Sequence, residues 1–303
     1  MTETELQRWP QEGEYFEFHG HRLFVRQGGQ GDPLLLIHGF PTSSFDWLRL
    51  WPGLAVRYRL LAIDMLGFGQ SDKPPAYDYS VAASADQWQA VALAQGLSEV
   101  AILAHDYGDT VAQELLARQG EGRLPFRIRA AVFLNGGLFP EATRPLLLQK
   151  LLLGPLGPLV AKLSSYRSFA GSLCRICVRP PPEAELREHW RLLARGEGRR
   201  VMPKLIRYIR ERHQHRERWL GSLQRSGIPL CLIDGLDDPV SGASVVRRWR
   251  ELLPHAPVIE LEGIGHYPQI EDAERVRTTF LAFMANATDG HPIIAVPASP
   301  SSG

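Results

Sequence analysis

The chain has 303 residues, of which 44% are apolar and 22% are charged, a composition typical of a globular protein and unlike that of a disordered or fibrous one. Its formal net charge is +1, so no overall electric field attracts nucleic acid or an anionic membrane. The length suits one large α/β domain, or a domain that carries a sizeable insertion.

The N-terminus and the cysteines bear on localisation. Residues 1–6 lack a basic segment followed by an apolar core, so we expect no signal peptide. Three cysteines are too few for a disulfide scaffold. Cys174 and Cys177 have neither a second cysteine pair nor a histidine at zinc spacing, and we expect them to be two buried helix neighbours. Cys231, in an apolar run, is expected in the core, and the cytoplasm is the expected compartment.

In chain order, apolar strands alternate with amphipathic stretches, which predicts a mostly parallel sheet with helices on both faces. Residues 15–18 and 22–26 flank a polar turn and predict an antiparallel hairpin at one edge. A crossover helix is expected at 80–95. Short apolar runs, typical of strands that are covered on both faces, follow at 34–37, 60–63, 100–104, 130–134, 229–233 and 258–261.

The stretch between residues 137 and 227 is far too long for a single loop. Helical patterns at 144–153, 182–195 and 201–219 predict an inserted helical cap over the carboxyl edge of the sheet. The expected organisation is a core of residues 1–137 and 228–286, a cap of residues 138–227, and a tail of residues 287–303. The tail has no periodicity, and we expect it to be disordered.

Two parts of the predicted cap have unusual composition. Residues 145–163 are rich in leucine, but Lys150, Lys162 and two Gly-Pro pairs make them a poor spanning helix, so we expect no integral membrane span. Their surface is expected to contact the core or the substrate, and peripheral contact with lipid ranks last. Residues 195–218 are strongly basic but include three glutamates, which favours a solvated helix face over an anion-binding site.

A candidate nucleophile lies where the strand at 100–104 gives way to a helical pattern. In a nucleophile elbow the central residue occupies a tight turn, with small residues two before and two after it so that strand and helix can approach. Ala104 and Gly108 provide that space around Asp106, and no G-x-S-x-G motif occurs in the chain. Asp106 is therefore the candidate nucleophile, and the alternative is an aspartate that caps the following helix.

Main-chain donors for an oxyanion hole are expected beside it. The strand at 34–37 runs directly into a His-Gly-Phe-Pro sequence. The backbone N–H that follows such a His-Gly pair acts together with the N–H that follows the nucleophile. These are the N–H groups of Phe40 and Tyr107. The alternative is an ordinary strand-to-loop turn.

A carboxylate and a histidine follow later strands. Asp238 lies directly before a proline just beyond the strand at 229–233, with Asp237 as the second candidate, and His266 lies on a glycine-rich loop after the last strand. The chain order Asp106, Asp238, His266 is the order of nucleophile, acid and base in this type of fold. Each residue alone is a weak indication, but the three together in this order predict a catalytic triad.

These elements, with the segment 64–74, resemble the epoxide hydrolase and haloalkane dehalogenase superfamily of α/β-hydrolases over nearly all of residues 15–286. The resemblance implies an α/β-hydrolase fold with a cap. A closer similarity, to the mesoderm-specific transcript subfamily, is carried by residues 105–109, 136–141, 144–152 and 266–272.

A carboxylate nucleophile suits displacement at an alkyl carbon, which gives an alkyl-enzyme ester. Water activated by His266 would split that ester, while Asp238 orients the imidazole and the two N–H groups hold the oxyanion. No cofactor or metal is expected for this chemistry. The expected partners are a small apolar substrate and water, with no nucleic acid.

The leaving group decides the substrate. The resemblance implies a tryptophan after the nucleophile and often an asparagine in the oxyanion loop for halide release, whereas this chain has Tyr107 and Phe40 there. Epoxide opening instead needs an acidic O–H, which cap tyrosines supply in such relatives. The candidates are Tyr166 and Tyr208, although Tyr208 would equally suit a packed core. Asn135, an amide, cannot replace Asp238 as the acid.

We therefore expect an epoxide hydrolase-like enzyme, with haloalkane or ester hydrolysis as the alternative within enzymes. The alternative of another class is a non-catalytic homologue that binds a lipid or a partner through the cap. The residues expected to contact substrate are His38, Trp47, His105, Tyr166, Tyr208 and Tyr267.

Overall fold

The computed structural model describes residues 8–288. Residues 1–6, where we expected no signal peptide, and most of the predicted tail therefore lie outside the described residues. Residues 287 and 288 end helix α14 and belong to the fold.

An eight-stranded sheet forms the centre of the molecule, with strand order β1-β2-β4-β3-β5-β6-β7-β8. β1 and β2 form the expected antiparallel hairpin, β2 pairs antiparallel with β4, and the remaining neighbours are parallel. The α/β fold predicted from the alternating pattern is confirmed. The strands are β1 Glu14–Phe18, β2 His21–Gly28, β3 Asp32–Ile37, β4 Tyr58–Ile63, β5 Glu99–Ala104, β6 Arg127–Phe133, β7 Leu230–Gly235 and β8 Val258–Leu261.

Helices cover both faces of the sheet because alternate side chains of each strand point to opposite sides. On β3, Leu35 and Ile37 join the apolar cluster beneath α3, α4, α11 and α12, while Leu34 and Leu36 join the cluster with η2, α2 and α14. These helices are α2 Trp51–Ala55, α3 Val81–Ala94, α4 Tyr107–Gly120, α11 Arg216–Gln224, α12 Ala243–Leu252 and α14 Ala273–Thr288; η2 spans Ser44–Trp47 and η1 Trp9–Gln11.

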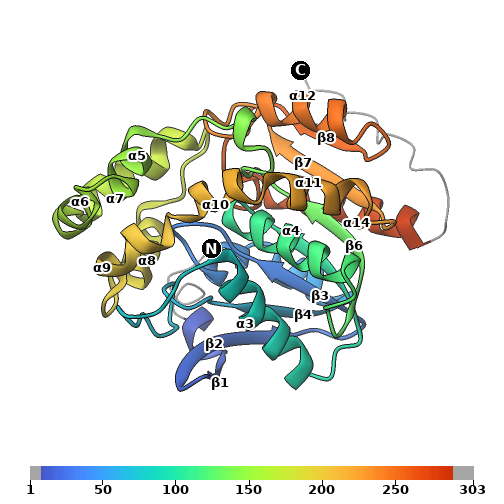
Figure 1. Cartoon of the computed structure of the whole chain (residues 1–303), viewed down its shortest axis with the longest axis horizontal. Helices are drawn as coiled ribbons and strands as arrows, with labels where there is room; N and C mark the ends of the chain where they lie inside the picture. Colours follow the sequence, from blue (N-terminus) through green and yellow to red (C-terminus); the bar gives the residue numbers. More distant parts are fainter. Residues whose placement is uncertain (1–7, 289–303) are drawn as a thin grey trace.

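The segment between β6 and β7 is mostly helical. Figure 1 shows its first helices, α5, α6 and α7, standing away from the sheet at one end of the molecule, with α8 and α9 between them and the core. The segment contains η3 Pro140–Ala142, α5 Leu147–Leu153, α6 Gly157–Leu163, α7 Tyr166–Ile176, α8 Glu183–Ala194, α9 Gly198–Leu205 and α10 Tyr208–Gln214 before α11. A short helix, α13 Pro268–Glu271, follows β8.

Two details of the predicted cap differ from the structure. The pattern at 201–219, expected to be one helix, is divided among α9, α10 and α11. α6 had not been predicted, and of α7 only the part around Cys174 was expected to be helical. α11 packs on α4 of the core, where Trp219 Nε1 donates to Glu114 at 2.9 Å and Ser222 Oγ donates to the Gln113 carbonyl at 3.2 Å. The end of the predicted cap segment therefore packs with the core.

The C-x-x-C pair also differs from expectation. Cys174 is exposed on α7, whereas Cys177 is buried just past the end of that helix, where the chain has turned to an extended conformation. Cys231 is buried in β7, as expected.

Within residues 8–288, no helix combines the length and the apolarity needed to cross a bilayer.

Candidate active site

Asp106 occupies a strained turn between β5 and α4. Its backbone φ is 48° and its ψ is −106°, a conformation that side chains other than glycine rarely adopt. The neighbours leave no spare room: a Cβ added to Gly108 would lie 2.2 Å from the Ile37 carbonyl oxygen, and one added to Gly136 would lie 2.9 Å from the Asp106 Cα. The small residues are thus required by the close approach of strand and helix.

The carboxylate of Asp106 is held from two sides. The Phe40 backbone N–H donates to Oδ2 at 3.1 Å. Arg212 Nη2 lies 3.4 Å from Oδ1 and donates to the Asp106 carbonyl oxygen at 2.9 Å. Tyr107, whose N–H was the second expected donor, is the first residue of α4. One carboxylate oxygen is therefore fixed by a main-chain donor, as a developing oxyanion would be.

Arg212, on α10, is a site residue that the sequence pattern missed. It belongs to the basic stretch 195–218, which was expected to be a solvated face, yet it is buried. Its Nε donates to Thr110 Oγ1 at 2.7 Å, and its guanidinium lies 4.5 Å from the centre of the Tyr208 ring. Nothing in the charge pattern distinguishes this arginine from its exposed neighbours, because only the orientation of α10 turns it inward.

A second buried group, Asp109, lies one helical turn beyond the nucleophile position. Neither of its carboxylate oxygens has a hydrogen-bond partner within residues 8–288. Burial, and then the charge of Asp106, raise the pKa of this carboxyl well above its usual value. Asp109 is therefore expected to remain protonated beside Asp106 and Arg212.

His266 and Asp238 form a close pair. His266 Nδ1 lies 2.7 Å from Asp238 Oδ2, and both side chains are buried. Burial alone would lower the pKa of His266, but the Asp238 carboxylate and its hydrogen bond raise that pKa to about 8, with a further contribution from Asp106. Burial opposes the charge on Asp238, yet the pKa of this carboxyl is lowered by His266 and by donors from its own loop.

Three residues orient Asp238. The Ser241 hydroxyl donates to Oδ2 at 2.7 Å, the Val240 N–H donates to Oδ1 at 2.8 Å, and the Asn135 amide donates to Oδ2 at 3.1 Å. The alternative acid, Asp237, instead accepts a hydrogen bond from the Gly263 N–H at 2.8 Å. The structure thus brings Asp238, and not Asp237, to His266.

The two other histidines expected at the site are buried, and their rings contact main-chain atoms of neighbouring loops. His105 Nε2 lies 2.8 Å from the His266 carbonyl oxygen, and burial lowers the pKa of His105 to about 3. A neutral His105 therefore supports the loop that carries His266. His38 Nε2 accepts from the Met65 N–H at 3.2 Å, and burial lowers its pKa also.

The predicted aromatic contacts divide into two groups. Tyr208 and Tyr267 lie near the triad: the Tyr208 ring packs on Phe40, with centroids 5.9 Å apart, and the Tyr267 ring lies 4.7 Å from that of His105. Neither hydroxyl finds a hydrogen-bond partner in the described chain.

Two expected substrate contacts lie elsewhere. Trp47, on η2, is fully buried in the apolar cluster that contains Leu34 and Leu36 of β3. Tyr166 begins α7, and its hydroxyl donates to Glu183 at 2.6 Å, away from Asp106. Neither residue lines the cavity described next.

A cavity of about 330 Å³ extends from His266 and Phe40 into the predicted cap, and Asp106 is not among the residues that line it. Pro41 and Val240 also belong to the core side of its wall, and most of the remaining wall is apolar. The polar exceptions on the cap side are Gln149 and three serines. The apolar wall residues from the cap include Leu146, Leu152, Phe169, Leu173, Trp190 and Met202.

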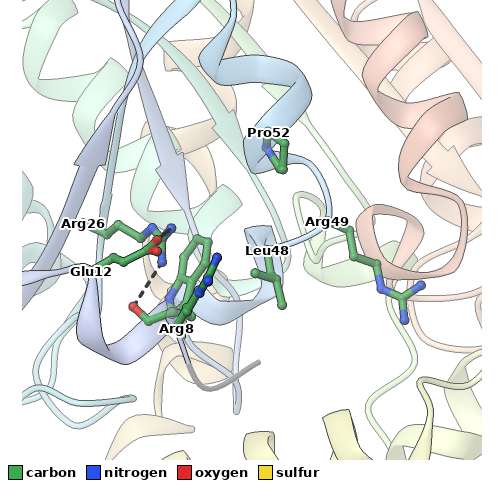
Figure 2. A pocket seen from close by; sticks show the side chains of 7 residues that line it. Arg8, Glu12, Arg26, Leu48, Arg49 and Pro52 are labelled. Carbon is green, nitrogen blue, oxygen red and sulfur yellow. Dashed lines mark hydrogen bonds and ion pairs between the residues drawn. The ribbon is translucent and has the colours of Figure 1, made fainter. Parts of the chain in front are cut away.

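A larger hollow, of about 480 Å³, lies near the N-terminal end of the described chain and contains no comparable constellation. Figure 2 shows Arg26 paired with Glu12 there, while Arg49 points away from that pair. Arg49 instead donates to Glu185 at 2.6 Å. Two of the cations of this hollow thus already have carboxylate partners.

In residues 8–288, no group of three or more histidine, cysteine, aspartate or glutamate side chains is arranged to hold a metal ion. The chemistry available at the site is that of a carboxylate, an imidazole with its carboxylate partner, and a main-chain donor.

Comparison with known proteins agrees with the fold. A family model described as the alpha/beta hydrolase fold matches residues 32–154. The mesoderm-specific transcript protein of Mus musculus is 38% identical over 293 residues, covering 92% of this chain and 88% of that protein. LipZ of Mycobacterium tuberculosis, named as a hydrolase, is 40% identical over 274 residues, covering 89% of this chain and 95% of that protein.

The chain therefore belongs to the α/β-hydrolase fold family, and within it resembles the mesoderm-specific transcript proteins. Among solved structures, the epoxide hydrolase CorEH is 20% identical with a TM-score of 0.74, covering 90% of this chain and 98% of that one. The haloalkane dehalogenase DbeA from Bradyrhizobium elkani is 22% identical with a TM-score of 0.78, covering 92% and 99%. At such identities the structures establish the fold alone.

Proposed function

We propose that this α/β-hydrolase uses Asp106 as a nucleophile and proceeds through a covalent alkyl-enzyme ester. The observation that carries the proposal is the position of the Asp106 carboxylate: it lies at the elbow, with Oδ2 on the Phe40 N–H, beside the His266–Asp238 pair. A helix-capping aspartate would accept from an N–H of its own helix, and Asp106 makes no such side-chain bond to α4.

The proposed first step is attack of Asp106 Oδ1 on an electrophilic carbon of the substrate. A C–O ester bond forms, the bond to the leaving oxygen breaks, and that oxygen takes its electron pair and then a proton. In the second step His266 removes a proton from water, and the resulting hydroxide attacks the ester carbonyl carbon. The Phe40 N–H holds the charge that develops on Oδ2, and collapse of the tetrahedral intermediate breaks the ester C–O bond, returns the carboxylate and releases the diol. The proton taken by His266 then replaces, through solvent, the proton that the leaving oxygen took in the first step.

The electrostatics of His266 suit this order of steps. The negative charge of Asp106 contributes to the raised pKa of His266 in the free protein. Ester formation removes that charge, so the pKa of His266 falls when the imidazole is needed as a base.

The cavity favours a small apolar substrate, and an epoxide is the proposed class. An epoxide needs a hydrogen-bond donor for its leaving oxygen, and the buried Tyr208 hydroxyl has no partner in residues 8–288 and lies near Asp106. Burial, and then the Asp106 charge, raise the pKa of Tyr208, so this phenol keeps its proton and can donate. Haloalkane hydrolysis is less favoured, since the phenol that follows the nucleophile, Tyr107, bonds to Ser84.

The test is to trap the intermediate. In His266→Gln the first step is retained, because attack by a carboxylate needs no base, whereas the second step loses its proton acceptor. Intact mass spectrometry after incubation with a reactive epoxide should show one added substrate mass. Peptide mapping should then locate that mass on the peptide that contains Asp106.

Asp106→Ala, checked for folding by circular dichroism, should form no adduct. An equal adduct on Asp106→Ala would refute the nucleophile, as would the absence of an adduct on His266→Gln with every electrophile that the wild type consumes.

A further inference from the structure

The helices α5 and α6 present leucines to the outside. Among the large apolar side chains exposed in the described chain, five lie between residues 147 and 163. They are Leu147 at 72% exposed, Leu151 at 41%, Leu156 at 58%, Leu159 at 54% and Leu163 at 71%. We call these five residues the leucine patch.

The spacing of the leucine patch gives each helix one apolar outer face. Leu147 and Leu151 are four residues apart on α5, and Leu156, Leu159 and Leu163 follow an i, i+3, i+7 pattern along α6. The inner sides of the same helices are already occupied, since Leu152 and Ala161 are buried. Packing of these helices therefore does not require the exposed leucines. Their common face also distinguishes them from isolated surface leucines, which are scattered.

Positive charge surrounds the leucine patch. Residues 144–182 contain six lysines and arginines and no aspartate or glutamate. Two more arginines reach in from later helices: Arg199 lies 3.5 Å from the Lys162 carbonyl oxygen, and Arg210 donates to the Leu153 carbonyl oxygen at 2.6 Å. A nearly neutral chain thus has a basic segment where most of its exposed large apolar side chains lie, although Arg179 is paired with Asp272. The basic residues of the segment, all exposed, are Arg144, Lys150, Lys162, Arg167, Arg175 and Arg179.

The patch is continuous with the cavity. Leu163 belongs to both, since its side chain is largely exposed and also lines the cavity wall. Ser164, at the end of α6, and Ser168, in the first turn of α7, line the cavity too, and Ser168 is exposed. The outer end of the cavity therefore reaches the surface at the edge of the leucine patch, and its other end reaches His266.

We propose that the leucine patch docks on an anionic lipid surface and that apolar substrate passes from the lipid into the cavity past Leu163. Exposed leucines beside lysines and arginines complement acyl chains beside anionic headgroups. A folded protein partner of ordinary surface composition would not require exposed leucines and a surrounding excess of positive charge together. The entry route rests on the proposed function, whereas the docking does not.

The test is flotation of the full chain with vesicles of phosphatidylcholine alone or mixed with phosphatidylglycerol. The wild type should float with the mixed vesicles and bind the neutral ones more weakly. The double variant Leu156→Gln and Leu159→Gln should lose about tenfold or more of its partitioning, because two leucines no longer leave water. Neither side chain lines the cavity, so turnover of a water-soluble substrate should be unchanged.

The matched control is the double variant Val56→Gln and Leu93→Gln, which removes two exposed apolar side chains far from the cap segment and should float like the wild type. Absence of wild-type binding to mixed vesicles, or equal binding by the patch variant, would overturn the proposal. So would light scattering that shows a wild-type dimer which the patch substitutions dissociate, because a second copy would then cover the leucines. Flotation requires no turnover, so its outcome is independent of the fate of Asp106 as nucleophile.

Discussion

At the scale of single residues, the site is defined as much by polar groups left without partners as by those that are paired. Burial of a hydroxyl without a hydrogen bond is unfavourable, and proteins mostly avoid it. Tyr208 is fully buried, and no described residue accepts from its hydroxyl. A substrate oxygen beside Asp106 would provide the missing acceptor, which distinguishes a catalytic tyrosine from a packed one.

Tyr208→Phe should lower kcat for epoxide hydrolysis by about tenfold or more, since donation to the leaving oxygen is lost. Its free energy of unfolding should be unchanged or higher, because an unsatisfied buried hydroxyl is removed. Steady-state kinetics and urea unfolding measure the two effects.

Tyr79→Phe is the matched control for Tyr208→Phe. Tyr79 is also buried, but its hydroxyl donates to the Pro74 carbonyl oxygen at 2.9 Å, so its loss should cost stability and leave kcat unchanged. Unchanged epoxide turnover by a folded Tyr208→Phe variant would assign Tyr208 to packing.

At the scale of elements, the position of Asp106 depends on how closely α4 approaches β3. Gly108 is on the first turn of α4, where an added Cβ would meet the Ile37 and His38 carbonyl oxygens. Neither oxygen can move without shifting the strand that leads to Phe40. Gly120 lies at the other end of the same helix, where an added Cβ would meet no heavy atom within 4 Å.

Gly108→Ala should lower the free energy of unfolding by about 2 kcal/mol or more, as overpacking against backbone does. It should also reduce turnover, because the helix and Asp106 shift together. Gly120→Ala should be neutral or slightly stabilising. Urea unfolding of both variants checks the contrast, and equal stabilities would show that the close approach has no energetic consequence.

At the scale of the whole molecule, the segment between β6 and β7 places a buried titratable side chain beside one of the core. His189 of α8 lies 3.8 Å from Asp46 of η2, and both side chains are fully buried. Burial raises the pKa of Asp46 well above its usual value, while burial and then Arg49 lower the pKa of His189 to about 3. The folded state therefore favours a protonated Asp46 and a neutral His189, whereas the unfolded state near pH 5 to 6 holds its proton on His189. The pair therefore adds little pH dependence to stability.

Removing either partner should expose a pH dependence of opposite sign. In Asp46→Asn, His189 stays neutral in the folded state but takes up a proton below about pH 6.5 in the unfolded state. The free energy of unfolding should therefore decrease as the pH is lowered, by about 1.4 kcal/mol per pH unit. In His189→Asn, only the folded state holds the Asp46 proton above about pH 4, so stability rises as pH falls.

The measurement is urea unfolding of the wild type and both variants between about pH 5 and 7. The difference from the wild type should change sign between the two variants. Parallel curves for all three proteins would contradict these protonation states.

The sequence by itself determined the sheet and the positions of the triad candidates. Strand periodicity and chain order are local properties, and loops that follow parallel strands must meet at one edge. This is why Asp106, Asp238 and His266, chosen from their places after strands, lie together in the structure. The choice between Asp237 and Asp238 depended on which carboxylate the loop turns toward the imidazole.

Only the tertiary structure decided which helix faces point inward. Arg212 is one arginine among many in its stretch, and the packing of α10 brings it to Asp106. Trp47 and Tyr166 have the composition of substrate contacts, yet one is buried in an apolar cluster of the core and α7 holds the other near Glu183. The physical reason is that the orientation of a short helix depends on contacts with residues distant in the chain, and local sequence does not encode those contacts.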